Sequence, residues 1–399
     1  MIYIKPRSIG SYPLTNLKTM SPFKILLCTL LLSNTLAQEL PNVLGTPPAK
    51  NKKEWTQTQR PKTLELFKKH VYGRAPIGKP KDLSFKVIEE DPKAMDGAAT
   101  LKIIEISYSG PGGKSSFKLI TFIPNKVKKP APGYLLICNR DRENIDPTRK
   151  KKDDFWPAET IVSRGYVAAT FHNSELSTDK NLNFDNGVHK VFDQDASERP
   201  GDAWGTIAGW AWGASRALDY FESTTDIDAL KIGVIGHSRG GKCALWAGAT
   251  DQRFALTISN NSGCTGAAIA RRKHGERVAR INKSFPHWFC GNYNAFNEKE
   301  EELPIDQHQL VALIAPRAVY VASATKDDWA DPKGEFLAAA HAEPVYNLFG
   351  LKGLATMEMP PPNKPILSGH VGYHIRSGKH DLTNYDWEQY LNFGDIHLK

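Results

Sequence analysis

The sequence contains few cysteines, and none stands close to another. Only five of its 399 residues are cysteine and no C-x-x-C pair occurs, so neither a zinc motif nor a redox motif is predicted. One or two disulfides remain open among Cys138, Cys243, Cys264 and Cys290, because their spacing cannot assign a pairing.

Several other patterns are missing, and each absence excludes a class of protein. There is no glycine period, long heptad run or second apolar stretch of membrane-spanning length, which excludes collagen, a coiled coil and a polytopic membrane protein. The net charge is +9, from 52 basic and 43 acidic residues, but it follows no periodic stripe, so no nucleic-acid partner is expected. Hydrophobic residues make up 40% of the chain, enough for a large folded core.

The first 37 residues have the pattern of a targeting signal. Lys24 precedes an apolar run at residues 25–32, and Ala37 is a small residue directly before a polar segment. This pattern is typical of a secretory signal peptide, and the run is too short to span a bilayer. We therefore predict a secreted or periplasmic protein with no membrane span in its mature form, and Met20 as a natural start of the signal. Loss of the four basic residues before Ala37 lowers the net charge from +9 to +5.

The next part of the chain predicts an arm, a helix and three strands. Residues 38–60 are rich in proline, lysine and polar side chains and predict an extended N-terminal arm. Residues 63–67 have helical spacing that stops near Gly73. Partly alternating apolar runs then predict half-exposed antiparallel strands, at residues 85–88, 101–106 and 117–123.

Beyond residue 130, short apolar runs alternate with helical stretches. Runs without clear alternation predict strands buried on both faces, at residues 134–138, 166–171, 232–236, 255–258 and 318–322. Helical stretches separate them, notably residues 203–222 and 240–250. Antiparallel strands that lead into alternating strands and helices predict one α/β domain, a three-layer sandwich with a mixed, mostly parallel sheet.

Residues 236–242 (GHSRGGK) carry the most informative motif. A buried strand runs into Gly236-x-Ser238-x-Gly240, and a predicted helix follows at once. This is the nucleophile elbow of α/β-hydrolases, where the serine sits on a strained turn and the glycines avoid collisions with neighbouring backbone. An ordinary glycine-rich turn would lack this strand and helix. We therefore predict Ser238 as a nucleophile and residues 61–399 as a single α/β-hydrolase catalytic domain.

A serine nucleophile needs an acid that orients its base. In this fold the chain order is serine, acid, histidine, and the acid follows a late strand. The loop after the strand that ends at residue 322 offers Asp327, Asp328 and Asp331. At least two of these aspartates must be turn or helix-cap residues.

The base is expected in a later loop. His370, His374 and His380 all follow the candidate acids. His380 is favoured, because it directly precedes a predicted closing helix at residues 383–393. The two earlier histidines would line the pocket or fill a polar loop.

The segment 236–242 also resembles the G-C-S-R-x-G-K signature of glucuronoyl esterases, α/β-hydrolases that cleave esters of 4-O-methyl-glucuronate on xylan. Further segments are similar to bacterial members of this family, at residues 261–268, 285–289, 313–317, 329–332 and 377–380. The resemblance covers roughly residues 60–398. Its serine–arginine–lysine signature is much more specific than the elbow alone.

The resemblance implies a role for each matching residue. Ser238 would be the nucleophile and His380 the base, while Arg239 would stabilise the oxyanion through its backbone N–H and its guanidinium. Three further residues would contact the sugar, the last of them by a looser match: Lys242, Trp329 and Glu276. The resemblance implies no metal and no organic cofactor.

The chain departs from the family pattern at two positions. Asn261 stands where many members carry a glutamate after the strand that follows the nucleophile helix. A neutral amide cannot stabilise an imidazolium as a carboxylate does, so the acid must come from the later loop, with Asp327 as first choice and Asp331 in reserve. His237 replaces a frequent cysteine, and the sequence offers no explanation for that change.

These observations predict a serine carboxylesterase that acts on esters of 4-O-methyl-glucuronic acid, with glucuronoxylan or another uronate ester as its partner. One alternative is an acetylxylan esterase, for which Lys242 and Trp329 would have no purpose. The other is a secreted, non-catalytic carbohydrate-binding homologue, which the loss of the glutamate at Asn261 would favour.

Overall fold

The computed structural model describes residues 40–193 and 199–399. The predicted N-terminal extension and signal peptide (residues 1–37) lie outside the described residues, so they stay a prediction. Within the described ranges, no helix is long and apolar enough to cross a membrane.

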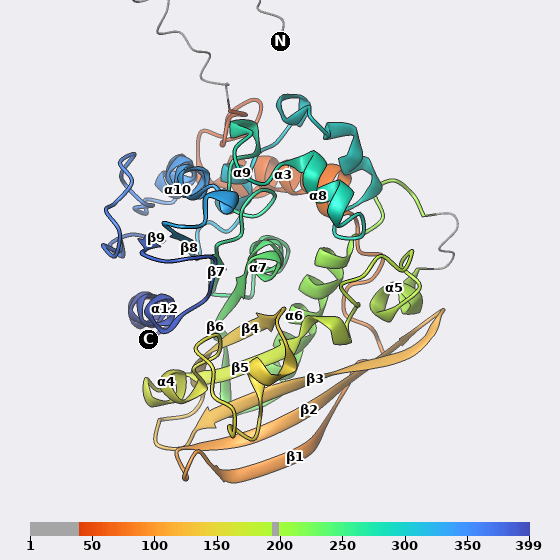
Figure 1. Ribbon diagram of the computed structural model, residues 1–399, viewed down its shortest axis with the longest axis vertical. Coiled ribbons are helices and arrows are strands. Elements are labelled where there is room, and N and C mark those ends of the chain that lie inside the picture. Colours follow the sequence, from red (N-terminus) through yellow and green to blue (C-terminus); the bar gives the residue numbers. More distant parts are fainter. Residues whose placement is uncertain (1–39, 194–198) are drawn as a thin grey trace, which may run out of the picture. The chain divides into compact units, whose positions relative to one another are not determined.

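A nine-stranded sheet forms the centre of the domain (Figure 1). The first three strands pair antiparallel, the third is antiparallel to β5, and all later neighbours pair parallel. Across the sheet the order is β1 (Ser84–Ala94), β2 (Ala99–Gly110), β3 (Gly113–Pro124), β5 (Val167–His172), β4 (Ala131–Cys138), β6 (Ile227–His237), β7 (Leu256–Asn260), β8 (Ala318–Ala324) and β9 (Val371–Arg376). The predicted mixed, mostly parallel sheet is confirmed, and β9 is an additional strand that the sequence patterns did not predict.

Helices cover both faces of the sheet. Side chains of β4 alternate between two cores: Leu135 and Ile137 belong to one, Tyr134 and Leu136 to the other. The first core contains residues of α6 (Thr206–Glu222), α7 (Arg239–Thr250) and α10 (Pro332–His341), and the second those of α4 (Ala158–Ser163) and α12 (Asn384–His397). Figure 1 shows α4 and α12 on the side of the sheet away from α6 and α7. This is the predicted three-layer sandwich.

Shorter helices complete the described part of the chain. They include α5 (Gly187–Phe192), α8 (Val278–Ser284), α9 (Gln307–Ala312) and α11 (Glu343–Leu348). Single turns of 3-10 helix are η3 (Arg142–Ile145), η4 (Asn173–Glu175), η6 (Ala270–Arg272), η7 (Gly291–Phe296), η8 (Glu300–Glu302) and η9 (Asp328–Ala330).

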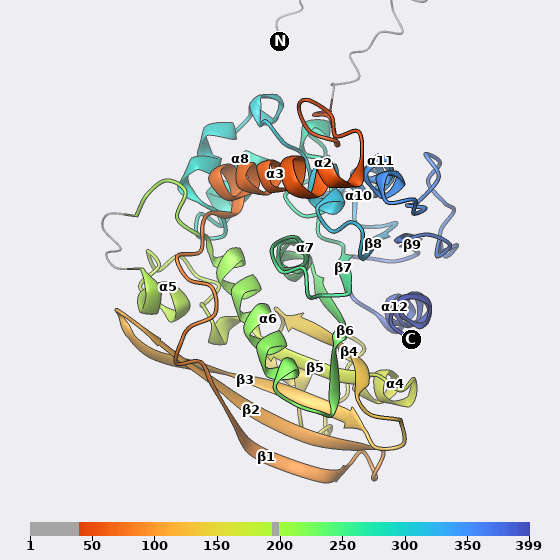
Figure 2. The same ribbon diagram turned by 180° about the vertical axis from the view of Figure 1, so that it is seen from behind.

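The prediction of an extended arm over residues 38–60 is wrong from residue 52 onward. One continuous helix runs over residues 52–72, built from α2 (Lys52–Glu54), the π-helical η1 (Trp55–Gln59), α3 (Arg60–Phe67) and the π-helical η2 (Lys68–Tyr72) (Figure 2). Most of its buried side chains recur every four residues, at Trp55, Gln59, Thr63, Phe67 and Val71, and Arg60 and Tyr72 are buried beside them. Because wider π turns keep this spacing on one face, a mostly polar sequence still packs one side of a helix on the core.

The cysteines of the described residues form no disulfide. Cys138, Cys243, Cys264 and Cys290 are free and buried, so the disulfides that the sequence left open do not occur among them. Burial raises the pKa of the Cys138 and Cys264 thiols to about 12, which keeps these thiols protonated at neutral pH.

Candidate active site

Ser238 lies at the sharp turn between β6 and α7. Its φ and ψ angles are 56° and −123°, a region that a residue with a side chain rarely adopts. The residue is half-buried, so the strained turn does not bury it among packed neighbours. α7 starts at Arg239. The N–H groups of Gly241 and Lys242 donate to the carbonyl oxygen of Ser238, whereas those of Arg239 and Gly240 precede the first backbone bond of the helix. The turn therefore combines a reachable hydroxyl with free amide donors.

The flanking glycines are required by close backbone contacts. A Cβ atom on Gly236 would lie 2.0 Å from the carbonyl oxygen of Gly240. A Cβ on Gly240 would lie 2.9 Å from Oδ1 of Asn139 and 3.1 Å from the carbonyl oxygen of Ile137. Real Cβ atoms do not approach other atoms so closely, so the G-x-S-x-G pattern follows from the packing of the turn.

Asp327 and His380 meet beside this turn. Nδ1 of His380 lies 2.6 Å from Oδ2 of Asp327, and the amide Nδ2 of Asn261 donates to the same oxygen at 2.8 Å. Burial by itself would raise the pKa of Asp327, but the hydrogen bond and charge of His380 and the bond from Asn261 outweigh it and lower the pKa. Asp327 is therefore a stable carboxylate that can orient the imidazole.

The other two candidate acids have different partners. Asp331 accepts a hydrogen bond from the backbone N–H of Gly334 at the start of α10, and it pairs with Nε of Arg272 at 2.7 Å. Asp328 is exposed and lies 2.8 Å from Nε2 of His274. Both therefore fit the turn or helix-cap role that the sequence required of at least two aspartates.

Glu335 fixes the backbone directly after Asn261. The φ angle of Asn261 is 46°, a left-handed conformation that asparagine tolerates better than most residues. The next two backbone N–H groups, of Ser262 and Gly263, donate to Oε1 of Glu335 at 2.6 and 3.0 Å. The amide of Asn261 thus supports Asp327 instead of replacing it.

His237 packs against the candidate base. The two imidazole rings of His237 and His380 lie 4.4 Å apart between centroids. Nδ1 of His237 lies 2.6 Å from Oδ1 of Asn260, whose amide nitrogen donates to the hydroxyl of Tyr390 at 2.8 Å. Burial, followed by the proximity of His380, lowers the pKa of His237 well below its ordinary value. A neutral His237 therefore supports the face of the His380 ring, a role that the sequence did not reveal.

Arg239 belongs to a cluster that sequence spacing could not reveal. Its guanidinium pairs with the carboxylate of Asp179 and lies 5.3 Å from the ring centre of Trp288. Asp179 also accepts hydrogen bonds from Nε2 of His287 at 2.9 Å and from Nε1 of Trp288 at 2.7 Å. Burial alone would raise the pKa of Asp179, but these bonds and the charge of Arg239 lower it to about 2. The guanidinium is therefore fixed beside the elbow.

The three predicted sugar contacts lie together on the next turn of α7 and two loops. Nζ of Lys242 is buried and lies 2.7 Å from Oε2 of Glu276. The backbone N–H of Glu276 donates to the carbonyl oxygen of Trp329 at 2.8 Å. The side chain of Trp329 is 53% exposed, which is unusual for a tryptophan. A buried ion pair and an exposed indole on backbone segments bonded to each other suit a polar ring such as a sugar.

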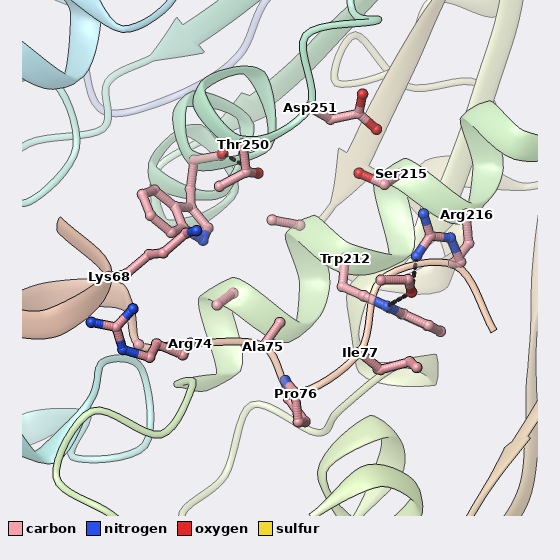
Figure 3. Close-up of a pocket in the computed structure, with 15 residues that line it drawn as sticks. Lys68, Arg74, Ala75, Pro76, Ile77, Trp212, Ser215, Arg216, Thr250 and Asp251 are labelled. Carbon is pink, nitrogen blue, oxygen red and sulfur yellow. Dashed lines mark hydrogen bonds between the residues drawn. The ribbon is translucent and has the colours of Figure 1, made fainter. Parts of the chain in front are cut away.

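A hollow lies away from these candidate site residues. It has a volume of about 510 Å³ and lies between α6, the end of α7 and residues 73–78 (Figure 3). Trp212 and Arg216 both donate to the carbonyl oxygen of Gly78 there. Ser238 directly precedes α7, and the first residue of that helix to line the hollow is Trp246, about 12 Å further along the axis, so the hollow is separate from the candidate active site.

The candidate site contains a serine, an imidazole, a carboxylate and fixed cations, which together can perform acyl transfer. Within residues 40–193 and 199–399, no group of three or more His, Cys, Asp and Glu side chains could hold a metal ion.

Solved structures with the same fold identify the class. A glucuronoyl esterase from Solibacter usitatus has a TM-score of 0.85 at 40% identity and covers 92% of this chain and 100% of its own. A glucuronoyl esterase of carbohydrate esterase family 15 from Teredinibacter turnerae has a TM-score of 0.81 at 29% identity, covering 91% of this chain and 90% of its own. The chain is therefore an α/β-hydrolase of the carboxylic ester hydrolase class.

Sequence comparisons give the family within that class. A carbohydrate esterase from an unknown prokaryotic organism is 41% identical over 394 residues, which cover 91% of this chain and 90% of the relative. A 4-O-methyl-glucuronoyl methylesterase of Podospora anserina is 28% identical over 314 residues, covering 72% and 58%. A family model described as glucuronyl esterase of fungi matches residues 155–350. The chain belongs to the glucuronoyl esterase family, as the signature at residues 236–242 predicted.

Proposed function

We propose that this chain hydrolyses esters of 4-O-methyl-glucuronic acid on glucuronoxylan through an acyl-enzyme on Ser238. Membership of the glucuronoyl esterase family supports this substrate class. The observation that carries the catalytic part is the 2.6 Å contact between Asp327 and His380 next to the elbow. The pair of Lys242 and Glu276 supports a polar, hydroxyl-bearing sugar as the acyl group.

The reaction follows from the positions of these groups. Nδ1 of His380 faces Asp327, so Nε2 is the nitrogen that takes the proton of Ser238 as its oxygen attacks the ester carbon. The backbone N–H and the guanidinium of Arg239 stabilise the oxyanion, and loss of one such donor costs about 3–4 kcal/mol in another serine hydrolase. His380 then protonates the departing alcohol. Water activated by the same histidine releases the uronic acid.

We also propose that the protein is secreted or periplasmic, with glucuronoxylan or another uronate ester as its partner. The targeting pattern of residues 1–37 supports export. The alcohol that leaves in the first step is not specified by any residue contact described above, so the proposal covers the uronate side of the ester.

Kinetics on two substrates distinguish the proposed function from its alternatives. We expect kcat/KM to be higher for methyl glucuronate than for p-nitrophenyl acetate, because only the uronate reaches Lys242 and Glu276. Preference for the acetate would favour an acetylxylan esterase instead. An inactive wild-type protein that still binds glucuronoxylan would favour the non-catalytic carbohydrate-binding alternative.

A further inference from the structure

The loop that carries His380 is closed by Arg376, a buried cation that has no part in the reaction above. Arg376 is the last residue of β9, and its side chain is only 5% exposed. Its Nη2 atom donates to the carbonyl oxygen of Lys379 at 2.8 Å and to that of Asp381 at 2.7 Å. One guanidinium therefore fixes the backbone on both sides of the base.

Arg376 is itself held by a buried carboxylate. Its Nε donates to Oδ2 of Asp386 at 2.8 Å. The same oxygen accepts the backbone N–H and the hydroxyl of Thr383 at 2.8 and 2.7 Å, which caps α12. Oδ1 of Asp386 lies 2.9 Å from Nε2 of His374, whose Nδ1 lies 2.9 Å from the hydroxyl of Tyr320. The guanidinium thus joins the loop to the fully buried centre of the sheet.

The same loop is bonded to the one that carries the acid. The backbone N–H of Thr325 donates to the carbonyl oxygen of Arg376 at 2.9 Å, and that of Lys326 to the carbonyl oxygen of Gly378 at 2.8 Å. Asp327 follows immediately. The position of His380 relative to Asp327 therefore depends on how the chain from residue 376 to residue 381 is held.

We propose that Arg376 is a positioning residue for the base: by binding the carbonyl oxygens of Lys379 and Asp381, it keeps His380 on Asp327. The proposal rests on the proposed function only in taking His380 as the base of the esterase. A lysine at this position would carry the same charge, but its single ammonium lacks the planar fork that reaches two carbonyls and a carboxylate at once.

The test is the variant Arg376→Lys, assayed on methyl glucuronate and on p-nitrophenyl acetate. We expect kcat to fall about 10- to 100-fold on both substrates, because small misplacements of a catalytic group have effects of this size. KM for the uronate should stay within about twofold, because Lys242 and Glu276 lie on other elements.

The split between kcat and KM, measured on folded protein, separates positioning from simple loosening of the fold. A misplaced His380 no longer faces Asp327 at 2.6 Å, so kcat of the folded variant should fall on both substrates while KM for the uronate holds. Partial unfolding would lower kcat only in proportion to the loss of folded protein, which circular dichroism measures.

Arg317→Lys is the matched control. Arg317 also donates to three backbone carbonyls, those of Gly248, Asp251 and Phe254, but it precedes β8 at the edge of the sheet opposite the candidate active site. We expect this variant to keep the wild-type kcat and KM. Equal losses of kcat in both variants, or a wild-type kcat in folded Arg376→Lys, would overturn the proposal.

Gly378→Ala tests the same hydrogen bonds of Arg376 without replacing the arginine. It serves as the test of the proposal if Arg376→Lys does not fold. A Cβ on Gly378 would lie 2.5 Å from Nη1 of Arg376, so we expect the same fall in kcat with KM for the uronate unchanged. Wild-type kinetics in this variant would contradict the proposal. If the wild type hydrolyses only the acetate, the proposed substrate fails, while the effect of Arg376 is still measured on the acetate.

Discussion

Nδ1 of His380 lies 2.6 Å from Oδ2 of Asp327, although the two residues are 53 positions apart and belong to different loops. The loops follow β8 and β9, which are parallel neighbours in the sheet. Since the carboxyl ends of parallel strands lie at one edge, loops distant in sequence meet there, beside the elbow after β6. The geometry of the sheet thus brings Asp327, His380 and Ser238 to one edge.

Asp327→Asn should lower kcat by about 10³- to 10⁴-fold, as loss of the triad carboxylate does in another serine hydrolase. Asp331→Asn makes the same chemical change four residues further on. It should leave kcat within about threefold, because Asp331 caps α10 and its cap is retained by asparagine. Steady-state kinetics of both variants on methyl glucuronate would check this, and a reversed order would assign the acid to Asp331.

Lys242→Met should discriminate between substrates. Loss of a hydrogen bond to a charged group costs about 1.5–3 kcal/mol, so kcat/KM for methyl glucuronate should fall about 10- to 100-fold. The value for p-nitrophenyl acetate should change by less than about threefold. Lys102→Met removes a partly buried lysine, paired with Asp226 at 3.0 Å on the far part of the sheet, and should affect neither substrate. Equal losses on both substrates would refute the sugar contact.

Asp179→Asn should make the protein less stable in a pH-dependent way. The pKa of Asp179 is lowered to about 2 in the fold, against about 3.9 in an unfolded chain. Its stabilisation, about 2 kcal/mol, is therefore complete above pH 4 and is lost as the pH falls from 4 towards 2. Urea unfolding at pH 6 and pH 3 should show the gap to wild type narrowing at the lower pH.

Asp185→Asn is the control for that measurement. Asp185 is an exposed aspartate that pairs with Lys190 at 3.1 Å, and such surface pairs contribute about 0–1 kcal/mol. Its variant should be nearly as stable as wild type at both pH values. A gap for Asp179→Asn that is the same at pH 6 and pH 3 would contradict the lowered pKa.

The sequence predicted those parts of the site that have a local signature. The elbow at Ser238 is visible because strand, glycines and helix are adjacent in the chain, and the chain order restricted the acid and the base to a few residues. The buried runs of β4 to β8 were visible for the same reason: each is short, apolar and flanked by a helix.

Contacts between distant segments could not be predicted. Asp179 lies 60 residues before Arg239 and in a loop, so no spacing links the two. Arg376 stands in a strand whose polar residues, His374 and Arg376, are buried and both contact the carboxylate of Asp386 of α12, far along the chain. The helical spacing at residues 63–67 was recognised, but the first turns of the N-terminal helix, over residues 52–60, were missed because that stretch is mostly polar and buries only Trp55, Gln59 and Arg60.

The most direct test of the account is hydrolysis of the methyl ester of 4-O-methyl-glucuronic acid by wild type and by Ser238→Ala, with folding of both checked by circular dichroism. The account predicts turnover by the wild type and a loss of at least about 10³-fold in the folded variant. Hydrolysis of this ester at the wild-type rate by folded Ser238→Ala would contradict it.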